Sequence, residues 1–155
     1  MLMLVTFLLY GPLPNSFGNT RNLSELFIQN NKISSVVPPE ISQAINLVKL
    51  DLSNNLLSGP IPSEIGNLME LNLRMLQSNK LNSSIPNSLS SLRSLNVLDL
   101  SNNLLIGNIP ESLCELLPNF INFSNNKLSG PIPLSLFKGE LVESFSDNPG
   151  LCVPT

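Results

Sequence analysis

The side chains suited to acid–base or covalent chemistry are few in this 155-residue chain, which contains no histidine. Asp51 and Asp99 stand in the same context, Leu-Asp-Leu-Ser-Asn-Asn, which occurs twice in the sequence. Two carboxylates work as general acid and base only when an enclosed site holds both beside a substrate. The spacing instead predicts that they lie two structural repeats apart, about 10 Å, on an open face. We therefore expect no catalytic residue, no metal site and no cofactor.

The two cysteines do not define a disulfide framework. Cys114 falls on the variable side of a repeat, and we interpret it as an apolar filler. Cys152 lies three residues from the end of the sequence.

A repeat with a period of about 24 residues organises the chain. Residues 47–62 read LVKLDLSNNLLSGPIP, and residues 95–110 read LNVLDLSNNLLIGNIP, two periods later. Apolar residues, an asparagine and a proline stand at the equivalent positions before, between and after these two segments. A fixed period in the twenties with LxxLxLxxNxL is typical of a leucine-rich-repeat solenoid. We expect an α/β solenoid, a right-handed superhelix of about five repeats with one parallel strand per repeat on its concave face.

Each repeat divides into three parts. The segments 25–28, 49–52, 97–100 and 120–123 alternate with period two, which predicts short strands. The following Leu-x-Gly-x-Ile-Pro part predicts extended backbone that bends at glycine. Apolar residues at helical-turn spacing then predict a turn that covers the outer side of the core.

One asparagine recurs after each strand, at Asn31, Asn55, Asn79, Asn103 and Asn126. Backbone groups that leave the sheet there are buried without strand partners, which is costly. An amide side chain carries a donor and an acceptor, so it can bond groups in its own coil and in the next one. We interpret these residues as a structural ladder rather than as ligand residues.

Arg74 is the clearest misfit, because the register places it in the inward-facing slot of Leu50 and Leu98. A buried, unpaired guanidinium is costly. We therefore expect the coil to shift, the side chain to reach solvent, or a partner to pair with it, and weak packing in this repeat.

The ends of the chain follow the same register. Leu2 and Leu9 lie two periods before Leu50 and Leu57, whereas Phe7 stands in the slot of the ladder asparagine. We interpret residues 1–22 as a partial N-terminal repeat whose start is missing, with a signal peptide as the alternative. Residues 23–137 are the leucine-rich repeats, and residues 138–155 are a truncated C-terminal cap.

Composition narrows the classes of partner. The net charge is −3 and no basic run occurs, which disfavours nucleic-acid binding. No stretch of about 20 apolar residues is present, so we expect no membrane span in this chain.

The form LxxLxLxxNxLSGxIPxxL, with GPIP or GNIP in three repeats, resembles the plant extracellular subclass of leucine-rich repeats. Residues 144–152, SFSDNPGLC, resemble the cap after the last repeat of plant receptor-like kinases. Together with ESLCELLPN and INFSNNKLSGPIPLSL, they look most like the receptors for C-terminally encoded peptides.

This resemblance implies a location outside the cell or on the outer face of the plasma membrane. It also implies perception of a secreted peptide together with a co-receptor, and a downstream cysteine as the partner of Cys152. The kinase domain of that family is absent from this sequence. The Arg-x-Arg pair that holds a peptide's terminal carboxylate in related receptors is also missing, since Arg21, Arg74 and Arg93 are isolated.

The outward slots of the strands are where such a solenoid recognises partners. Phe27 and Met75 are the most informative, because large apolar side chains on an uncovered face indicate a contact surface. For Asp51 and Asp99 a solvated face is the simpler interpretation. The candidate binding residues are Glu25, Phe27, Gln29, Lys49, Asp51, Met75, Gln77, Asp99 and Asn122, and the same face includes Ser53, Val97, Ser101 and Phe120.

Three Asn-x-Ser sequons, at Asn22, Asn82 and Asn122, are candidate glycosylation sites in a secreted protein. Asn82 falls in a loop after a strand. Asn122 falls on the concave side, where a glycan would obstruct binding.

The resemblance implies a protein- or peptide-binding module of a plant receptor-like kinase ectodomain, and the residues present predict no enzymatic activity. The expected partners are a secreted peptide, a co-receptor ectodomain, or both, and the missing arginine pair favours the co-receptor. Two alternatives stay open: a secreted inhibitor resembling the polygalacturonase-inhibiting proteins, and a truncated gene product without independent activity.

Overall fold

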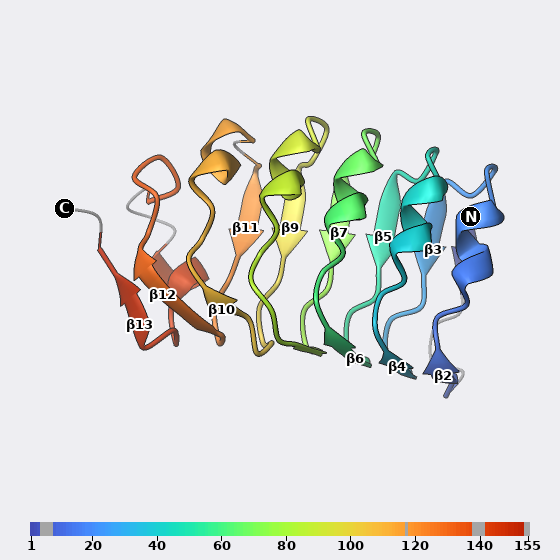
Figure 1. The fold of residues 1–155 in the computed structure, drawn as a ribbon, viewed down its shortest axis with the longest axis horizontal. Coiled ribbons are helices and arrows are strands. Elements are labelled where there is room, and N and C mark those ends of the chain that lie inside the picture. The colour runs from blue at the N-terminus through green and yellow to red at the C-terminus, as the bar shows by residue number, and fades with distance from the viewer. Residues whose placement is uncertain (4–7, 117, 138–141, 154–155) are drawn as a thin grey trace.

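The computed structural model describes residues 1–3, 8–116, 118–137 and 142–153. The chain winds into a single row of stacked coils, with the two termini at opposite ends of the row (Figure 1). Each complete coil passes through a strand of one long sheet, a short extended segment at the opposite edge and a 3-10 helix. The predicted α/β leucine-rich-repeat solenoid is confirmed.

The long sheet has six strands and runs the length of the stack (Figure 1). Its neighbouring strands are parallel and pair one repeat apart, so Leu26, Leu50, Arg74 and Leu98 are register partners. Leu2 pairs with Leu26, which places residues 1–3 in the register of the repeat, while Phe7 lies outside the described residues. In spatial order the strands are β1 (Leu2–Met3), β3 (Glu25–Phe27), β5 (Lys49–Asp51), β7 (Leu73–Met75), β9 (Val97–Asp99) and β11 (Phe120–Asn122).

The extended segments that follow the turn out of the long sheet, several of them with the Leu-x-Gly-x-Ile-Pro form, make two smaller parallel sheets at the opposite edge. Glycine takes a positive φ where this segment bends, for example +73° at Gly59. One sheet contains β2 (Tyr10–Pro12), β4 (Lys32–Ser35), β6 (Leu56–Gly59) and β8 (Lys80–Leu81). The other contains β10 (Ile106–Gly107), β12 (Lys127–Pro131) and β13 (Gly150–Cys152).

All helical segments among the described residues are short 3-10 helices. Five of them follow a proline in extended conformation, and each spans five residues. In the third, the Ile65 N–H donates to the Pro62 carbonyl at 3.2 Å, which closes the tighter turn. The helices are η1 (Asn15–Asn19), η2 (Pro39–Gln43), η3 (Ser63–Asn67), η4 (Asn87–Ser91), η5 (Glu111–Glu115) and η6 (Val142–Phe145). No helix in the described part of the chain has the length and hydropathy needed to cross a membrane.

A continuous apolar core fills the coils between the long sheet and the 3-10 helices. It runs from Leu13 to Phe145, whose ring lies 6.0 Å from that of Phe123. Cys114 is half-buried against this core, and Cys152 is exposed; both are free thiols. Each coil therefore buries apolar side chains against its neighbours, and the described part of the chain has no single central core.

The ladder asparagines are buried and join neighbouring coils. Asn55 Oδ1 accepts a hydrogen bond from the Ile33 N–H at 3.0 Å, and its Nδ2 donates to the carbonyls of Ile28 and Leu52. Asn79, Asn103 and Asn126 make the same three kinds of bond. We expected each amide to bond its own coil and the next one. That expectation is wrong, because each amide bonds its own coil and the preceding one.

Asn148 continues this ladder beyond the repeats recognised in the sequence. Its Oδ1 accepts from the Leu128 N–H at 3.0 Å, and its Nδ2 donates to the carbonyls of Phe123 and Phe145. It follows Asn126 by nearly one period, which is the spacing that would have revealed it. Residues 142–152 therefore cover the C-terminal end of the stack as a further coil.

Arg74 keeps the register of the leucines and is fully buried. Its Nε, Nη1 and Nη2 atoms have no hydrogen-bond partner among the described residues. The expectation that the coil shifts, or that the side chain reaches solvent or pairs, is wrong for this part of the chain. Burial lowers the pKa of Arg74 to about 9, so the core of this coil holds a cation at neutral pH.

Candidate partner-binding face

Side chains at alternate positions of the long sheet point away from the core and line its outer, concave side. Strand pairing arranges them in rows that cross the coils. The first row contains Glu25, Lys49, Leu73, Val97 and Phe120, and the second row contains Phe27, Asp51, Met75, Asp99 and Asn122. A third row, just beyond the strand ends, contains Gln29, Ser53, Gln77, Ser101 and Ser124.

The first row begins with an ion pair. Lys49 Nζ lies 2.9 Å from Glu25 Oε1, and both side chains are partly exposed. The two charges cancel, so this end of the row is polar without carrying net charge.

Asp51 and Asp99 order the turns that follow their strands. Asp51 Oδ1 accepts hydrogen bonds from the Ser53 N–H at 3.0 Å and the Ser53 hydroxyl at 2.6 Å. Asp99 holds Ser101 in the same way, at 3.0 and 2.7 Å. Neither carboxylate forms an ion pair with a described residue. Each therefore has a structural role; Asp51 is buried, with 8% of its surface exposed, whereas Asp99 is half-buried and is the more accessible carboxylate on the face.

Asn122 occupies the equivalent slot in the last strand of the long sheet. Its Oδ1 accepts from the Ser124 N–H at 3.0 Å, and the side chain is half-buried. The other two sequon asparagines, Asn22 and Asn82, are exposed. Glycosylation at all three stays a prediction.

In two of the coils that lack an aspartate, an apolar residue on the strand is followed two positions later by glutamine. Phe27 precedes Gln29, and Met75 precedes Gln77, and all four side chains are half-buried. The Oε1 atoms of both glutamines are covered and accept no hydrogen bond within the described structure. The second row therefore alternates between apolar and acidic side chains from Phe27 to Asp99.

Three apolar side chains of the first row form a group; the sequence placed Val97 and Phe120 on this face, whereas Leu73 was not among the predicted residues. Leu73, Val97 and Phe120 are direct register partners on β7, β9 and β11. Phe120 is 44% exposed, and the other two are half-buried. We call these three residues the apolar stripe. In the sequence, each of these residues stands two positions before Met75, Asp99 or Asn122. The three side chains become neighbours only when the strands pair.

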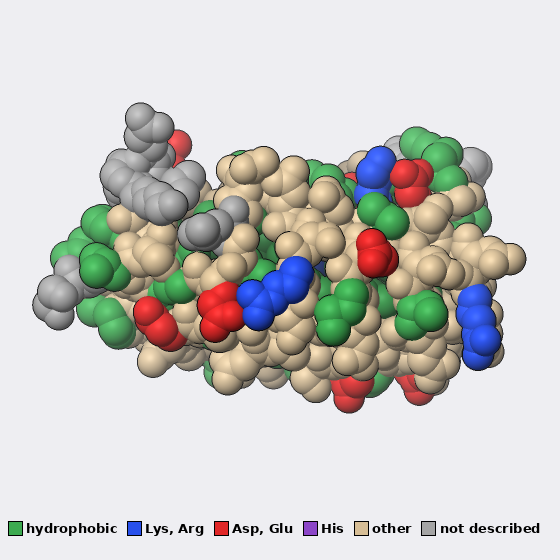
Figure 2. Space-filling model, turned by 90° about the horizontal axis from the view of Figure 1, so that it is seen from above, with side chains coloured by type: hydrophobic (Ala, Val, Ile, Leu, Met, Phe, Trp, Pro, Cys, Tyr) green, Lys and Arg blue, Asp and Glu red, His purple; other side chains and the backbone are tan. Residues whose placement is uncertain are grey.

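Charge is sparse on the rest of the described surface. Figure 2, which looks down on the turns that enter the long sheet, shows Lys and Arg side chains standing apart rather than gathered in a patch. Arg93 donates to Glu115 at 3.2 Å between neighbouring coils. This surface offers no extended basic area for a polyanion.

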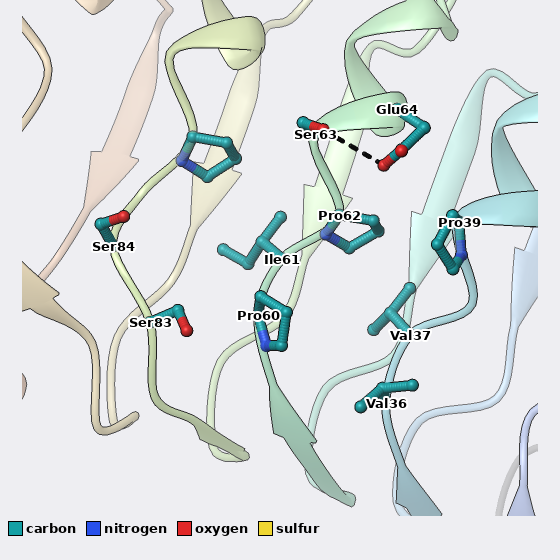
Figure 3. Close-up of a pocket in the computed structure, with 11 residues that line it drawn as sticks. Val36, Val37, Pro39, Pro60, Ile61, Pro62, Ser63, Glu64, Ser83 and Ser84 are labelled. Carbon is teal, nitrogen blue, oxygen red and sulfur yellow. Dashed lines mark hydrogen bonds between the residues drawn. The ribbon is translucent and has the colours of Figure 1, made fainter.

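A shallow, largely apolar pocket of about 490 Å³ lies away from the strand face. Figure 3 shows Val36 and Val37 on one side of it and Pro60, Ile61 and Pro62 on the next coil. It contains none of the candidate binding residues. The candidate binding residues therefore lie on the strand face and not in this pocket.

The family model described as Leucine Rich Repeat matches residues 22–44, 46–68, 94–116 and 119–138. This protein belongs to the leucine-rich-repeat family. The repeat that holds Arg74 lies between the matched segments.

The sequence is 75% identical over 40 residues to the receptor protein-tyrosine kinase CEPR1 of Arabidopsis thaliana, covering 26% of this chain and 4% of CEPR1. The plant peptide hormone receptor RGFR1, solved in complex with RGF2, superposes with a TM-score of 0.85 at 39% identity. That match covers 87% of this chain and 22% of RGFR1.

The Arabidopsis receptor kinase HAESA, solved with the peptide hormone IDA and the co-receptor SERK1, superposes with a TM-score of 0.75 at 31% identity. That match covers 94% of this chain and 28% of HAESA. The predicted resemblance to plant receptor-kinase ectodomains is confirmed. The chain spans only a small part of the length of each of these relatives.

Proposed function

We propose that the strand face of this protein is a peptide- and partner-binding surface of an extracellular plant receptor of the receptor-kinase class. The observation that carries the proposal is the composition of the first two rows. They leave Phe27, Met75 and the apolar stripe partly exposed beside Asp99, which is half-buried and forms no ion pair with a described residue. Exposed apolar side chains bordered by polar ones mark contact surfaces.

The comparisons support the class of ligand. The RGFR1 structure contains RGF2, and the HAESA structure contains a peptide hormone and a co-receptor. Their coils superpose on those of this chain. We therefore propose a secreted peptide, a co-receptor ectodomain, or both as partners here.

The arginines bear on how a partner is recognised. Arg74 is buried, whereas Arg21 and Arg93 are exposed and lie in turns outside the strands. No arginine of the described residues lines the strand face, so a peptide's terminal carboxylate has no guanidinium to bind there. This arrangement favours contact through side chains, as in a protein–protein interface.

We infer a binding module rather than an enzyme. The acidic side chains of the strand face lie on separate coils of an open sheet, and the chain has no histidine. An exposed face does not exclude water from reacting groups, whereas catalytic sites do.

Binding of the full chain to the SERK1 ectodomain and to a displayed random-peptide library tests the proposal. We expect Met75→Ser to weaken binding of at least one of these probes by about fivefold, because burial of a thioether side chain is worth roughly 1 kcal/mol or more at an interface. Met69→Ser is the matched control, since Met69 is 54% exposed but lies in a turn. Absence of binding by both probes, or equal effects of the two substitutions, would count against the proposal.

A further inference from the structure

We propose that the C-terminal half of the strand face recognises a peptide segment in which a large apolar side chain lies two positions from a lysine or arginine. This inference rests on the proposed function, because it specifies the chemistry of the ligand for the same face. It is carried by the apolar stripe and by the half-buried carboxylate of Asp99, which forms no ion pair with a described residue.

The apolar stripe supplies the first half of the site. Leu73, Val97 and Phe120 stand side by side on three neighbouring parallel strands, which are about 4.8 Å apart. They form a band about 10 Å wide, enough to receive one aromatic or branched side chain. The band ends at the Lys49–Glu25 ion pair, where the row becomes polar.

Asp99 supplies the second half. It stands two residues after Val97 on β9, so both side chains point to the same side of the sheet, about 7 Å apart along the strand. The bonds from Ser101 to Oδ1 hold the carboxylate in one orientation. The second oxygen, Oδ2, accepts no hydrogen bond from a described residue and is available to a ligand.

The net charge of the face favours a cation. Asp51 and Asp99 flank Met75 in the second row, while Lys49 and Glu25 cancel each other. These four side chains are the charged groups of the three rows, and they sum to −2. The aliphatic stem of a lysine or arginine fits over Met75 while its charged end reaches the carboxylate of Asp99, since Asp51 is buried.

The spacing of the peptide follows from the spacing of the face. In an extended peptide, side chains at i and i+2 point the same way and lie about 7 Å apart. This matches the separation of Val97 and Asp99. A neighbouring pair at i and i+1 points to opposite sides and cannot occupy both positions.

The test uses the full chain and three synthetic peptides with acetylated and amidated ends, so that no terminal charge contributes. Their central sequences are Phe-Ser-Arg, Phe-Ser-Glu and Ser-Ser-Arg within the same Gly-Ser flanks. We expect the first to bind most tightly, and we expect raised salt to weaken it. Asp99→Asn should lower its affinity about fivefold, the effect of a partly exposed ion pair.

Two variants separate charge from folding. Asn keeps the Oδ1 acceptor that holds Ser101, so Asp99→Asn should leave the unfolding midpoint nearly unchanged. Glu70→Gln removes one exposed carboxylate in a turn and should leave affinity unchanged. Val97→Ser should weaken the Phe-Ser-Arg peptide but not the Ser-Ser-Arg peptide.

The outcomes distinguish this inference from the proposed function. Equal affinities for Phe-Ser-Arg and Phe-Ser-Glu, or equal effects of Asp99→Asn and Glu70→Gln, would overturn the inference. If the SERK1 ectodomain or library peptides still bind and respond to Met75→Ser, the proposed function survives that result. If none of these probes binds the strand face, both fail.

Discussion

Arg74 is the register partner of Leu50 on the neighbouring strand, and its guanidinium lies in the row that leucine fills on both sides. The side chain is completely buried, and none of its nitrogens bonds to a described residue. A single residue therefore places an uncompensated charge in a row that leucine fills at Leu26, Leu50 and Leu98.

Replacing this residue should stabilise the protein. We expect Arg74→Leu to raise the free energy of unfolding by roughly 3 kcal/mol, because it removes a desolvated charge and restores apolar packing. Urea denaturation followed by circular dichroism measures the change. Arg93→Leu, at an exposed site, should stay within about 0.5 kcal/mol of the parent. A loss of stability in Arg74→Leu would show that the guanidinium has a partner.

The same residue should make stability depend on alkaline pH. Burial lowers the pKa of Arg74 to about 9 in the folded protein, below its value in the unfolded chain, so above about pH 9 the unfolded chain binds more protons. Stability contributed by this residue should then rise with pH, whereas below about pH 9 its penalty is constant. We expect the advantage of Arg74→Leu over the parent to be flat from about pH 6 to about pH 8 and to shrink above about pH 9.

Because both proteins share every other titrating group, the difference between their urea curves isolates Arg74. The difference between Arg93→Leu and the parent should show no such trend. An advantage that grows above about pH 9 would contradict the assigned direction of the pKa shift.

Removing an asparagine of the ladder should lower the stability of the protein. We expect Asn55→Leu to destabilise the protein by roughly 1–3 kcal/mol, because the Ile33 N–H and the Ile28 and Leu52 carbonyls lose their partner. Thermal unfolding measures this loss of stability. Asn67→Leu is the control, because Asn67 is exposed. Unchanged thermal unfolding of Asn55→Leu would contradict the structural role of the ladder.

A matched pair of glycines should separate backbone strain from crowding between coils. Gly59 and Gly107 have similar positive φ values, +73° and +77°. A Cβ at Gly59 would lie 2.8 Å from Val36 Cγ1, whereas at Gly107 the nearest atom is Ser84 Cβ at 3.7 Å. We expect Gly107→Ala to cost roughly 1 kcal/mol from strain, and Gly59→Ala roughly 1 kcal/mol more.

The double variant Gly59→Ala with Val36→Ala checks the source of the extra cost, since Val36 lies on the preceding coil, across the pocket of Figure 3. The double variant should recover most of the additional loss of unfolding free energy that Gly59→Ala shows relative to Gly107→Ala. Equal losses in Gly59→Ala and Gly107→Ala would show that the coils separate enough to absorb a methyl group.

Much of this architecture is readable from one-dimensional spacing. The period of about 24 residues places one strand in each coil, and the alternation within LxLxL determines which side chains face the core. The slots of Leu50, Asn55 and Asp99 follow directly, because neighbouring coils repeat the same local geometry. The likeness to receptor-kinase ectodomains follows from the same residues.

Properties that depend on contact between coils were decided only by the tertiary structure. The ladder amides bond the preceding coil, and Asn148 extends the ladder although no leucine repeat surrounds it. Leu73, Val97 and Phe120, which belong to separate repeats of the sequence, become one stripe only when their strands pair. The repeat placed Arg74 inside, but packing on both sides decided that it stays there unpaired among the described residues. The physical reason is common to all of these: periodicity determines a residue's place within its own coil, whereas bonding partners, burial and continuous surface belong to the stack.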